Sequence, residues 1–362
     1  MIVISFKSDI MRNMKTRVFV AVDNQIKEQE LQEASSVIRA GGLVAFPTET
    51  VYGLGGDATN PSASRKIYEA KGRPSDNPLI VHIAHFSQLE DIVSEVPKEA
   101  RILAEHFWPG PLTMILPKNE QIPYETTGGL DTVAIRMPSH PVARAFLEDS
   151  GCMIAAPSAN TSGRPSPTTA QHVWEDLQGR IDVILDGGAV GIGIESTIID
   201  LTEETPVILR PGFITQEMLQ EVLGTVKMDP GIDGSDSHQP PKAPGMRYRH
   251  YAPKAELTIV EGRQEDVVAR INQLSAQAVC GGRRVGVLAT EETKEFYHAE
   301  YVIAIGQRDD EAEIARHLFD VLRQFDALEV DVIYSESFDT AGLGQAIMNR
   351  LLKAAGHKRI FV

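Results

Sequence analysis

The amino-acid sequence predicts an α/β protein in two domains: a mixed sheet with helices packed on it, then a small parallel α/β domain. A length of 362 residues favours two domains over one. In the first part, strand-like apolar runs come both singly and in succession between helical segments, which favours a mixed sheet. From Leu257 onward, strand-like and helical segments alternate, as in a parallel sheet with crossover helices.

The first domain is predicted over 26–223, after an N-terminal extension at 1–25. A helical pattern over 26–40 ends at Gly41-Gly42. Asn60-Pro61 starts a second helix, over 61–70, because Asn caps a helix and Pro fits its first turn. Further helices are predicted over 99–107, 141–148 and 215–223. Strands are predicted over 43–46, 79–83, 112–116, 133–137, 153–156, 183–185, 196–201 and 207–209.

Residues 224–256 are predicted to be a linker. The segment is rich in Gly, Pro, Ser and Asp and has no apolar period. Its second half, 237–255, contains no acidic residue but four cations and two tyrosines, Tyr248 and Tyr251. A spacer in an acidic chain would share the acidic bias, so this cationic and aromatic half is expected to face a ligand.

The second domain is predicted over 257–362. Its strands are expected at 257–260, 285–288, 301–305 and 332–334, and its helices at 265–278 and 344–355. Ile314, Leu318, Leu322 and Phe325 mark one apolar face of another helix between them.

The overall charge limits the classes of partner. The chain has 35 Lys and Arg against 50 Asp and Glu, a net charge of −15, so broad binding to nucleic acid or a membrane surface is not expected. No apolar run approaches the ~20 residues that span a bilayer. Two cysteines, Cys152 and Cys280, give neither a disulfide framework nor a zinc site and fit reduced thiols in the cytoplasm.

The segment 71–78, with sequence KGRPSDNP, is the first candidate ligand loop. Lys71 and Arg73 flank Gly72, so both side chains can pass a backbone that carries no Cβ. Arg offers a fork for phosphate oxygens and Lys a mobile point charge. The alternative is a surface loop with two solvated cations.

Four further polar segments follow predicted strands or end them. The stretch 156–166 is rich in hydroxyls, which together with backbone N–H groups can hold an anion, or it is simply the turn before a helix near Thr169. The stretch 47–55 is polar and aromatic at a strand end, or an ordinary turn. In 131–138, Arg136 shares a strand face with Thr132 and needs an anion if buried. Polar groups also end strands near 195–197 and 210–212.

Common catalytic motifs are missing from the sequence. It contains no NTPase phosphate loop, no complete dinucleotide fingerprint and no Gly-x-Ser-x-Gly elbow. No His, Cys and carboxylate set has metal-ligand spacing. Of the histidines, His82 and His250 are the best placed near the candidate loops, although a lone His more often has a structural role. We therefore expect no covalent nucleophile and no protein-held metal, and catalysis by positioning and electrostatics.

These segments together resemble the YrdC-like family. Lys71-x-Arg73 followed by Ser158-x-Asn160 is similar to its signature, and the stretches at 47–55, 132–138, 195–200 and 209–212 also match. The ending PGMRYRHYAP at 244–253, followed by an α/β domain, resembles the long, two-domain form of threonylcarbamoyl-AMP synthase. The resemblance covers the chain from about residue 26 to the C-terminus. It implies a twisted open α/β sheet and a Rossmann-like second domain.

The resemblance also implies a reaction. L-threonine, bicarbonate or CO2, and ATP would give threonylcarbamoyl-adenylate and pyrophosphate, with ATP as substrate, Mg²⁺ bound through its phosphates and no permanent cofactor. The product would serve threonylcarbamoyl modification of the adenosine next to the anticodon in tRNAs that read ANN codons, by downstream tRNA threonylcarbamoyl-transferase machinery. Rival readings are a module that binds double-stranded RNA, and a carbamoyl-phosphate enzyme, whose usual acylphosphatase-like and zinc-finger segments are missing from the sequence.

Residue roles follow from the resemblance, position by position. The signature residues Lys71, Arg73, Ser158 and Asn160 are expected to be catalytic. The expected ATP contacts are Arg73, Asn77, Thr132, Ser158, Ser166, Arg210 and Tyr251. The expected L-threonine contacts are Thr50, His82, Arg136, Ala156 and Ser196. Tyr251 makes the linker at 224–256 a candidate lid that closes over the nucleotide.

Overall fold

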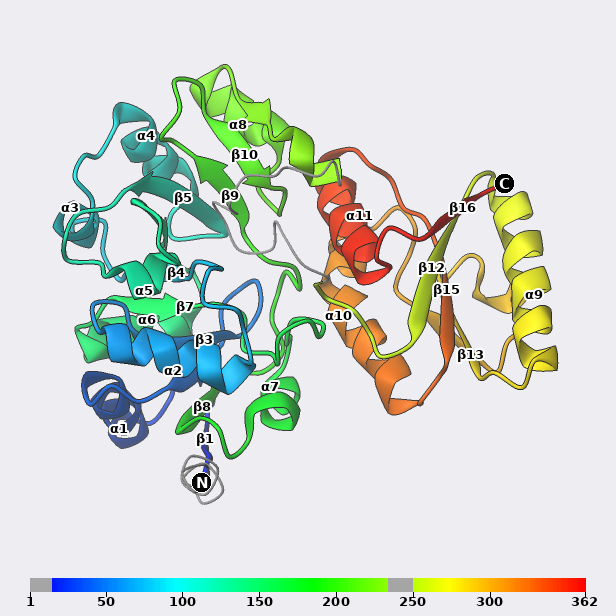
Figure 1. Ribbon diagram of the computed structural model, residues 1–362, viewed down its shortest axis with the longest axis horizontal. Helices are drawn as coiled ribbons and strands as arrows, with labels where there is room; N and C mark the ends of the chain where they lie inside the picture. Colours follow the sequence, from blue (N-terminus) through cyan, green and yellow to red (C-terminus); the bar gives the residue numbers. More distant parts are fainter. Residues whose placement is uncertain (1–14, 234–249) are drawn as a thin grey trace, which may run out of the picture.

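The computed structural model describes residues 15–233 and 250–362. Two sheets organise this part of the chain, one large and mixed, the other small and parallel (Figure 1). The predicted fold class is confirmed. No helix in the described ranges is long and apolar enough to cross a membrane.

The large sheet has eleven strands within the described residues, in the order β1-β8-β2-β3-β7-β4-β6-β5-β9-β10-β11. The strands are β1 (Arg17–Val20), β2 (Val44–Phe46), β3 (Gly53–Asp57), β4 (Ile80–His82), β5 (Leu112–Pro117), β6 (Thr132–Arg136), β7 (Ile154–Ala156), β8 (Val183–Asp186), β9 (Thr197–Asp200), β10 (Val207–Arg210) and β11 (Lys227–Met228). The helices on it are α1 (Glu28–Arg39), α2 (Pro61–Lys71), α3 (Gln88–Ile92), α4 (Lys98–Phe107), α5 (Tyr124–Thr127), α6 (Pro141–Ser150), α7 (Ala170–Leu177) and α8 (Gln216–Leu223).

Helix α2 leads directly into the cationic loop at 71–78. Asn60 caps it by accepting a hydrogen bond from the Ser62 amide, as predicted. Gly72 ends it with φ +62°, a left-handed conformation that Gly adopts without strain. The chain therefore turns sharply between Lys71 and Arg73, and the two side chains leave in different directions.

Several elements were not predicted from the sequence. Strand β1 lies within 1–25 and pairs in parallel with β8. Strand β11, parallel to β10, and a 3₁₀ turn at Pro230–Asp233 lie within 224–256. Strand β3 is Gly-rich and overlaps the stretch 47–55, where the sequence predicts no strand. A Cβ at Gly55 would lie 2.7 Å from Ile154 Cγ2, so the strand needs its glycines to pack closely.

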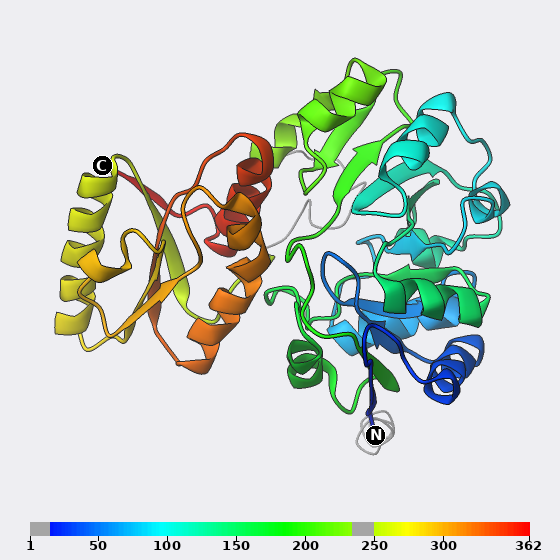
Figure 2. The ribbon, with the colours of Figure 1, turned by 180° about the vertical axis from the view of Figure 1, so that it is seen from behind.

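The small sheet has five parallel strands within the described residues, in the order β14-β13-β15-β12-β16. They are β12 (Glu256–Glu261), β13 (Val285–Ala289), β14 (Tyr301–Ala304), β15 (Val332–Glu336) and the unpredicted β16 (Arg359–Phe361). Helix α9 (Gln264–Cys280) covers one face. Helices α10 (Glu311–Ala327) and α11 (Gly342–Ala354) cover the other and lie between the two sheets (Figure 2).

Candidate active site

A cavity lies where the polar segments of the large sheet meet. Its walls come from the β2–β3 and α2–β4 connections, strand β4, the ends of β6 and β7, the loop after β7, the segment before β9, the end of β10 and the linker at His250 and Tyr251. The lining residues are Thr48, Thr50, Val51, Tyr52, Gly53, Lys71, Arg73, Ile80, His82, Arg136, Ala156, Pro157, Ser158, Asn160, Ser162, Gly163, Glu195, Ser196, Arg210, His250 and Tyr251. Eleven of the fourteen sequence-predicted site residues are among them.

Arg136 forms one side of the cavity at the end of β6. It is 4% exposed, and its Nη2 lies 2.7 Å from Glu49 Oε1. Its Nη1 donates to Thr50 Oγ1 at 2.8 Å. Burial raises the pKa of Glu49, but the Arg136 charge and its hydrogen bond hold that pKa below its usual value. Glu49 is therefore the anion that a buried Arg136 requires, although no pattern in the sequence marks it.

His82 is a neutral histidine on the same side. Burial and the nearby Arg136 charge lower the pKa of His82 to about 3. Its Nδ1 lies 3.0 Å from the Ile80 carbonyl, which fixes the ring with Nδ1–H as donor. The other nitrogen is then an acceptor. Ser196 also lines the cavity, with Oγ 2.7 Å from Thr113 Oγ1, and Thr113 pairs with Arg136 between β5 and β6.

Arg73 and Arg210 bring two further positive charges to the cavity. Arg73 Nη2 donates to the Pro78 carbonyl at 3.1 Å, and Arg210 Nε donates to the Ser196 carbonyl at 3.0 Å. Burial lowers the pKa of each guanidinium, to about 10, and both remain charged at neutral pH. Charged groups held this rigidly suit the binding of phosphate oxygens.

Glu195 lies behind Arg210 and is tied to the second sheet. It accepts from Ser166 Oγ at 2.5 Å and from Arg350 Nε of α11 at 3.0 Å. Burial raises the pKa of Glu195, but the Arg350 and Arg210 charges hold it below its usual value. Arg350 is fully buried and also donates to the Pro211 carbonyl. No sequence pattern predicts that Glu195 and Arg350 form a pair.

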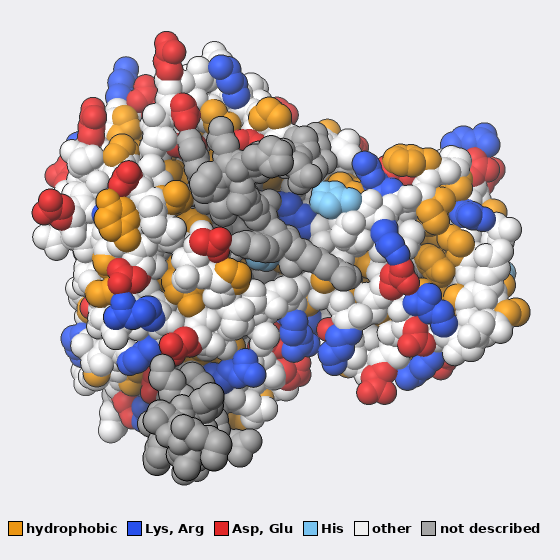
Figure 3. Space-filling model, viewed as in Figure 1, with side chains coloured by type: hydrophobic (Ala, Val, Ile, Leu, Met, Phe, Trp, Pro, Cys, Tyr) orange, Lys and Arg blue, Asp and Glu red, His pale blue; other side chains and the backbone are white. Residues whose placement is uncertain are grey.

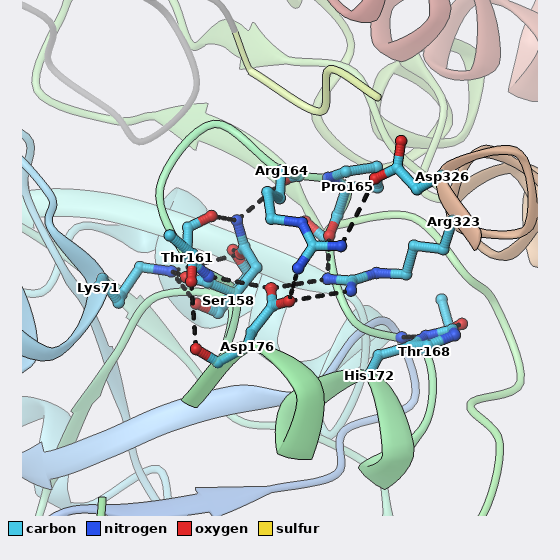
Figure 4. A network of polar contacts seen from close by, with 12 residues as sticks. Lys71, Ser158, Thr161, Arg164, Pro165, Thr168, His172, Asp176, Arg323 and Asp326 are labelled. Carbon is cyan, nitrogen blue, oxygen red and sulfur yellow. Dashed lines mark hydrogen bonds and ion pairs between the residues drawn. The ribbon is translucent and has the colours of Figure 1, made fainter. Parts of the chain in front are cut away.

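Lys71 holds the loop after β7 from inside. Its Nζ donates to the Ser158 and Asn160 carbonyls and, at 3.3 Å, to Asn160 Oδ1 (Figure 4). Burial and the Arg73 charge lower the pKa of Lys71 well below its usual value. Three acceptors match the three N–H donors of an ammonium group. Lys71 thus differs from the mobile point charge expected from the sequence.

Asn160 and Ser158 complete that turn. Asn160 Nδ2 donates to the Thr161 and Arg164 carbonyls, and Ser158 Oγ donates to Asn160 Oδ1 at 2.6 Å. The signature pairs Lys71-x-Arg73 and Ser158-x-Asn160 are therefore one connected unit. Lys71 and Asn160 shape the loop, while Arg73 and Ser158 lie at the cavity surface.

His250 and Tyr251 close the cavity from the linker. Tyr251 stacks on Phe319 of α10 with ring centroids 5.1 Å apart, and burial raises the pKa of Tyr251 to about 12. Burial and the Arg73 charge lower the pKa of His250 to about 3. Most of the predicted cationic half, 237–249, lies outside the described residues.

Three predicted ATP contacts do not line the cavity. Asn77 is 2% exposed, with its carbonyl accepting from Tyr68. Ser166 is fully buried against Glu195. Thr132 starts β6, at the other end of that strand from Arg136. Their part in ATP binding stays a prediction.

Comparison with known proteins assigns the family. A model described as "Telomere recombination" matches residues 36–212, and one described as "Threonylcarbamoyl-AMP synthase, C-terminal domain" matches 214–356. The threonylcarbamoyl-AMP synthase of Bacillus subtilis is 52% identical over 96% of this chain and 100% of its own length. The chain belongs to the threonylcarbamoyl-AMP synthase family.

Other members of the threonylcarbamoyl-AMP synthase family agree in sequence and structure. The synthase of Pyrococcus abyssi is 51% identical over 95% of this chain and 99% of its own length. The crystal structure of P. abyssi Sua5 complexed with L-threonine has a TM-score of 0.90 at 50% identity, covering 96% of this chain and 99% of that one. Escherichia coli YciO matches only part of the chain, 54%, with a TM-score of 0.50 and 26% identity.

Proposed function

We propose that the protein is a threonylcarbamoyl-AMP synthase. It condenses L-threonine, bicarbonate or CO2, and ATP to threonylcarbamoyl-adenylate and pyrophosphate. The observation that carries this proposal is one cavity that combines three arginines, Arg73, Arg136 and Arg210, with a neutral His82. Such a cavity suits one substrate with a carboxylate and one with phosphates, and relatives above 50% identity over nearly the whole chain bear the enzyme's name.

The L-threonine site is proposed on the side of Arg136. The residues assigned to it are Thr50, His82, Arg136, Ala156 and Ser196, which all line the cavity. The guanidinium of Arg136 suits a carboxylate, and the acceptor nitrogen of His82 suits the substrate amine. The buried hydroxyl groups of Thr50 and Ser196 provide further hydrogen bonds.

The ATP site is proposed on the side of Arg73, Ser158, Arg210 and Tyr251. Asn77, Thr132 and Ser166 remain predicted ATP contacts, the buried ones acting through neighbouring groups. Mg²⁺ is proposed to enter with ATP, held by phosphates and water.

The chemistry requires a neutral amine and a stabilised leaving group. A free α-amine has a pKa of about 8, and nearby guanidinium groups favour its neutral form. The amine attacks CO2 to give a carbamate, whose oxygen attacks the α-phosphorus and displaces pyrophosphate. Negative charge grows on phosphate oxygens, where Arg73 and Arg210 are already fixed in place.

The biological setting follows the same proposal. The adenylate would pass to tRNA-modifying machinery in the cytoplasm. The proposed division is a catalytic unit at 26–223, a linker or lid at 224–256 and a second unit at 257–362, with Tyr251 excluding water from the adenylate. The RNA-binding alternative has less support, because positive and negative side chains are interspersed on the face in Figure 3.

The decisive experiment measures pyrophosphate release by the purified full-length chain. We expect pyrophosphate release that requires ATP, L-threonine and bicarbonate together. Release should stop when threonine is omitted. The nucleotide product is identified as threonylcarbamoyl-adenylate by mass spectrometry. RNA binding at low salt without threonine-dependent pyrophosphate release would favour the alternative instead.

A further inference from the structure

Helix α10 of the second unit presents three side chains in a row toward the proposed active site. Phe319, Arg323 and Asp326 are spaced by four and three residues, so they lie on one face of the helix. All three are buried. Phe319 stacks on Tyr251, and Asp326 Oδ1 accepts from the Lys254 amide at 2.7 Å. One rigid helix therefore supports the linker end at two points.

Arg323 is the member of the row that reaches the large sheet. Its Nη2 donates to Asp176 Oδ2 at 2.9 Å and to the Pro165 carbonyl at 2.6 Å (Figure 4). Its side chain is 4% exposed and that of Asp176 is fully buried. A buried ion pair is a weak general source of stability, because desolvation offsets the attraction. The contacts that the Arg323–Asp176 pair makes are therefore more informative than its contribution to stability.

Asp176 connects Arg323 to the loop after β7. Its Oδ2 accepts from the Thr161 amide at 3.0 Å, and its Oδ1 accepts from Arg164. Thr161 directly follows Asn160, the residue that Lys71 grips from the other side. The Ser158–Ser166 loop is thus held by Lys71 at Ser158 and Asn160, and by Asp176 at Thr161 and Arg164.

We propose that Arg323 is a positioning residue for ATP binding. Through Asp176 it fixes the backbone at Thr161 and with it the turn that presents Ser158 to the nucleotide. The second unit then completes the site rather than merely anchoring the linker. This inference rests on the proposed function, since it assumes that the loop contacts ATP.

The test compares full-length Arg323→Met, Arg323→Lys and Asp176→Asn with wild type. KM is measured separately for ATP and L-threonine by pyrophosphate release. We expect Arg323→Met to lower kcat/KM for ATP about 100-fold, mostly through KM, since a small misplacement of a binding loop costs about that much. KM for threonine stays within about 2-fold. Arg323→Lys keeps one donor group and recovers to within about 10-fold of wild type.

Arg283→Met is the matched control. Arg283 also bonds one carboxylate, Glu256, and one backbone carbonyl, Asp331, but lies entirely within the second unit. Its kinetics should equal those of wild type. Backbone hydrogen exchange over 158–166 gives a readout that needs no activity. It should be faster in Arg323→Met and Asp176→Asn and unchanged in Arg283→Met.

The outcomes separate the two proposals. A fall in kcat with both KM values and loop exchange unchanged would mean a purely stabilising pair and would overturn the inference. If Arg323→Met does not fold, Arg323→Lys and Asp176→Asn decide by the same criteria. If the wild type releases no threonine-dependent pyrophosphate, the proposed function fails, while the exchange data still judge the coupling of Arg323 to the loop.

Discussion

Lys71 and Arg73 are two residues apart and equally charged, yet they serve the cavity in different ways. Lys71 points inward, and its Nζ donates hydrogen bonds to three acceptors in the turn at Ser158–Asn160. Arg73 turns the other way after Gly72 and rests on the carbonyls of Asn77 and Pro78 beside the cavity. The difference teaches that one cationic motif can combine a structural charge with a ligand-binding charge. A substitution at each position should separate the two.

Lys71→Met should have the largest effect. It leaves the buried Ser158 and Asn160 carbonyls without their donor, at about 1–3 kcal/mol for each unsatisfied group. We expect the free energy of unfolding to fall by about 3 kcal/mol, and pyrophosphate release to fall about 1000-fold because the turn loses its shape. Urea denaturation and steady-state kinetics check both. A variant with wild-type stability that loses only ATP affinity would place Lys71 on the nucleotide instead.

Arg73→Ala should separate function from stability. Only bonds to two carbonyls are lost, so unfolding should change by about 1 kcal/mol or less. Loss of a guanidinium that binds phosphate should lower kcat/KM for ATP about 100- to 1000-fold. Arg65→Ala is the control, since Arg65 lies on α2, the helix that precedes Arg73, and pairs on the surface with Glu125. Near-normal turnover in Arg73→Ala would contradict the phosphate role.

The sequence predicted the parts of this comparison that depend on local chemistry. Asn60 caps the start of α2, and Gly72 ends the helix in a left-handed turn. Both features depend only on neighbouring residues. The polar segments at strand ends meet in one cavity because strands of one sheet end near one another. Glu195 and Arg350 are 155 residues apart, and their pairing depends on how α11 packs against the large sheet. The burial of Lys71 is not predictable from composition, because it depends on the loop that Lys71 holds.

The free energy of unfolding should fall in acid, first through His82 and at lower pH through the glutamates that pair with arginines. The unfolded-state pKa of His is about 6.5 and that of folded His82 is about 3, so the unfolded chain binds more protons between these values. Stability is therefore full above pH 6.5 and falls as pH drops toward 3, by about 2 kcal/mol at pH 5. Glu49 and Glu195, whose pKa values are lowered, add to the loss only below about pH 4.5.

Urea denaturation at pH 7 and pH 5 measures this response. His82→Gln should remove about 2 kcal/mol of the pH dependence between these values. The pKa of His250 is also lowered, to about 3, so wild type should lose more stability than His82 alone explains. An unchanged slope in His82→Gln would mean that the ring is not held neutral.

Thr132→Ala should have the smallest effect and tests the far edge of the ATP side. Thr132 is partly exposed at the start of β6 and is absent from the cavity lining. One neutral hydrogen bond from a solvated hydroxyl contributes about 0.5–1 kcal/mol, so KM for ATP should rise about 3-fold and kcat should stay unchanged. Thr59→Ala, with a surface hydroxyl bonded to Asp57, controls for loss of an exposed threonine. No change would remove Thr132 from the ATP site. A loss as large as in Arg73→Ala would mean that phosphate binding does not depend mainly on the guanidinium charges.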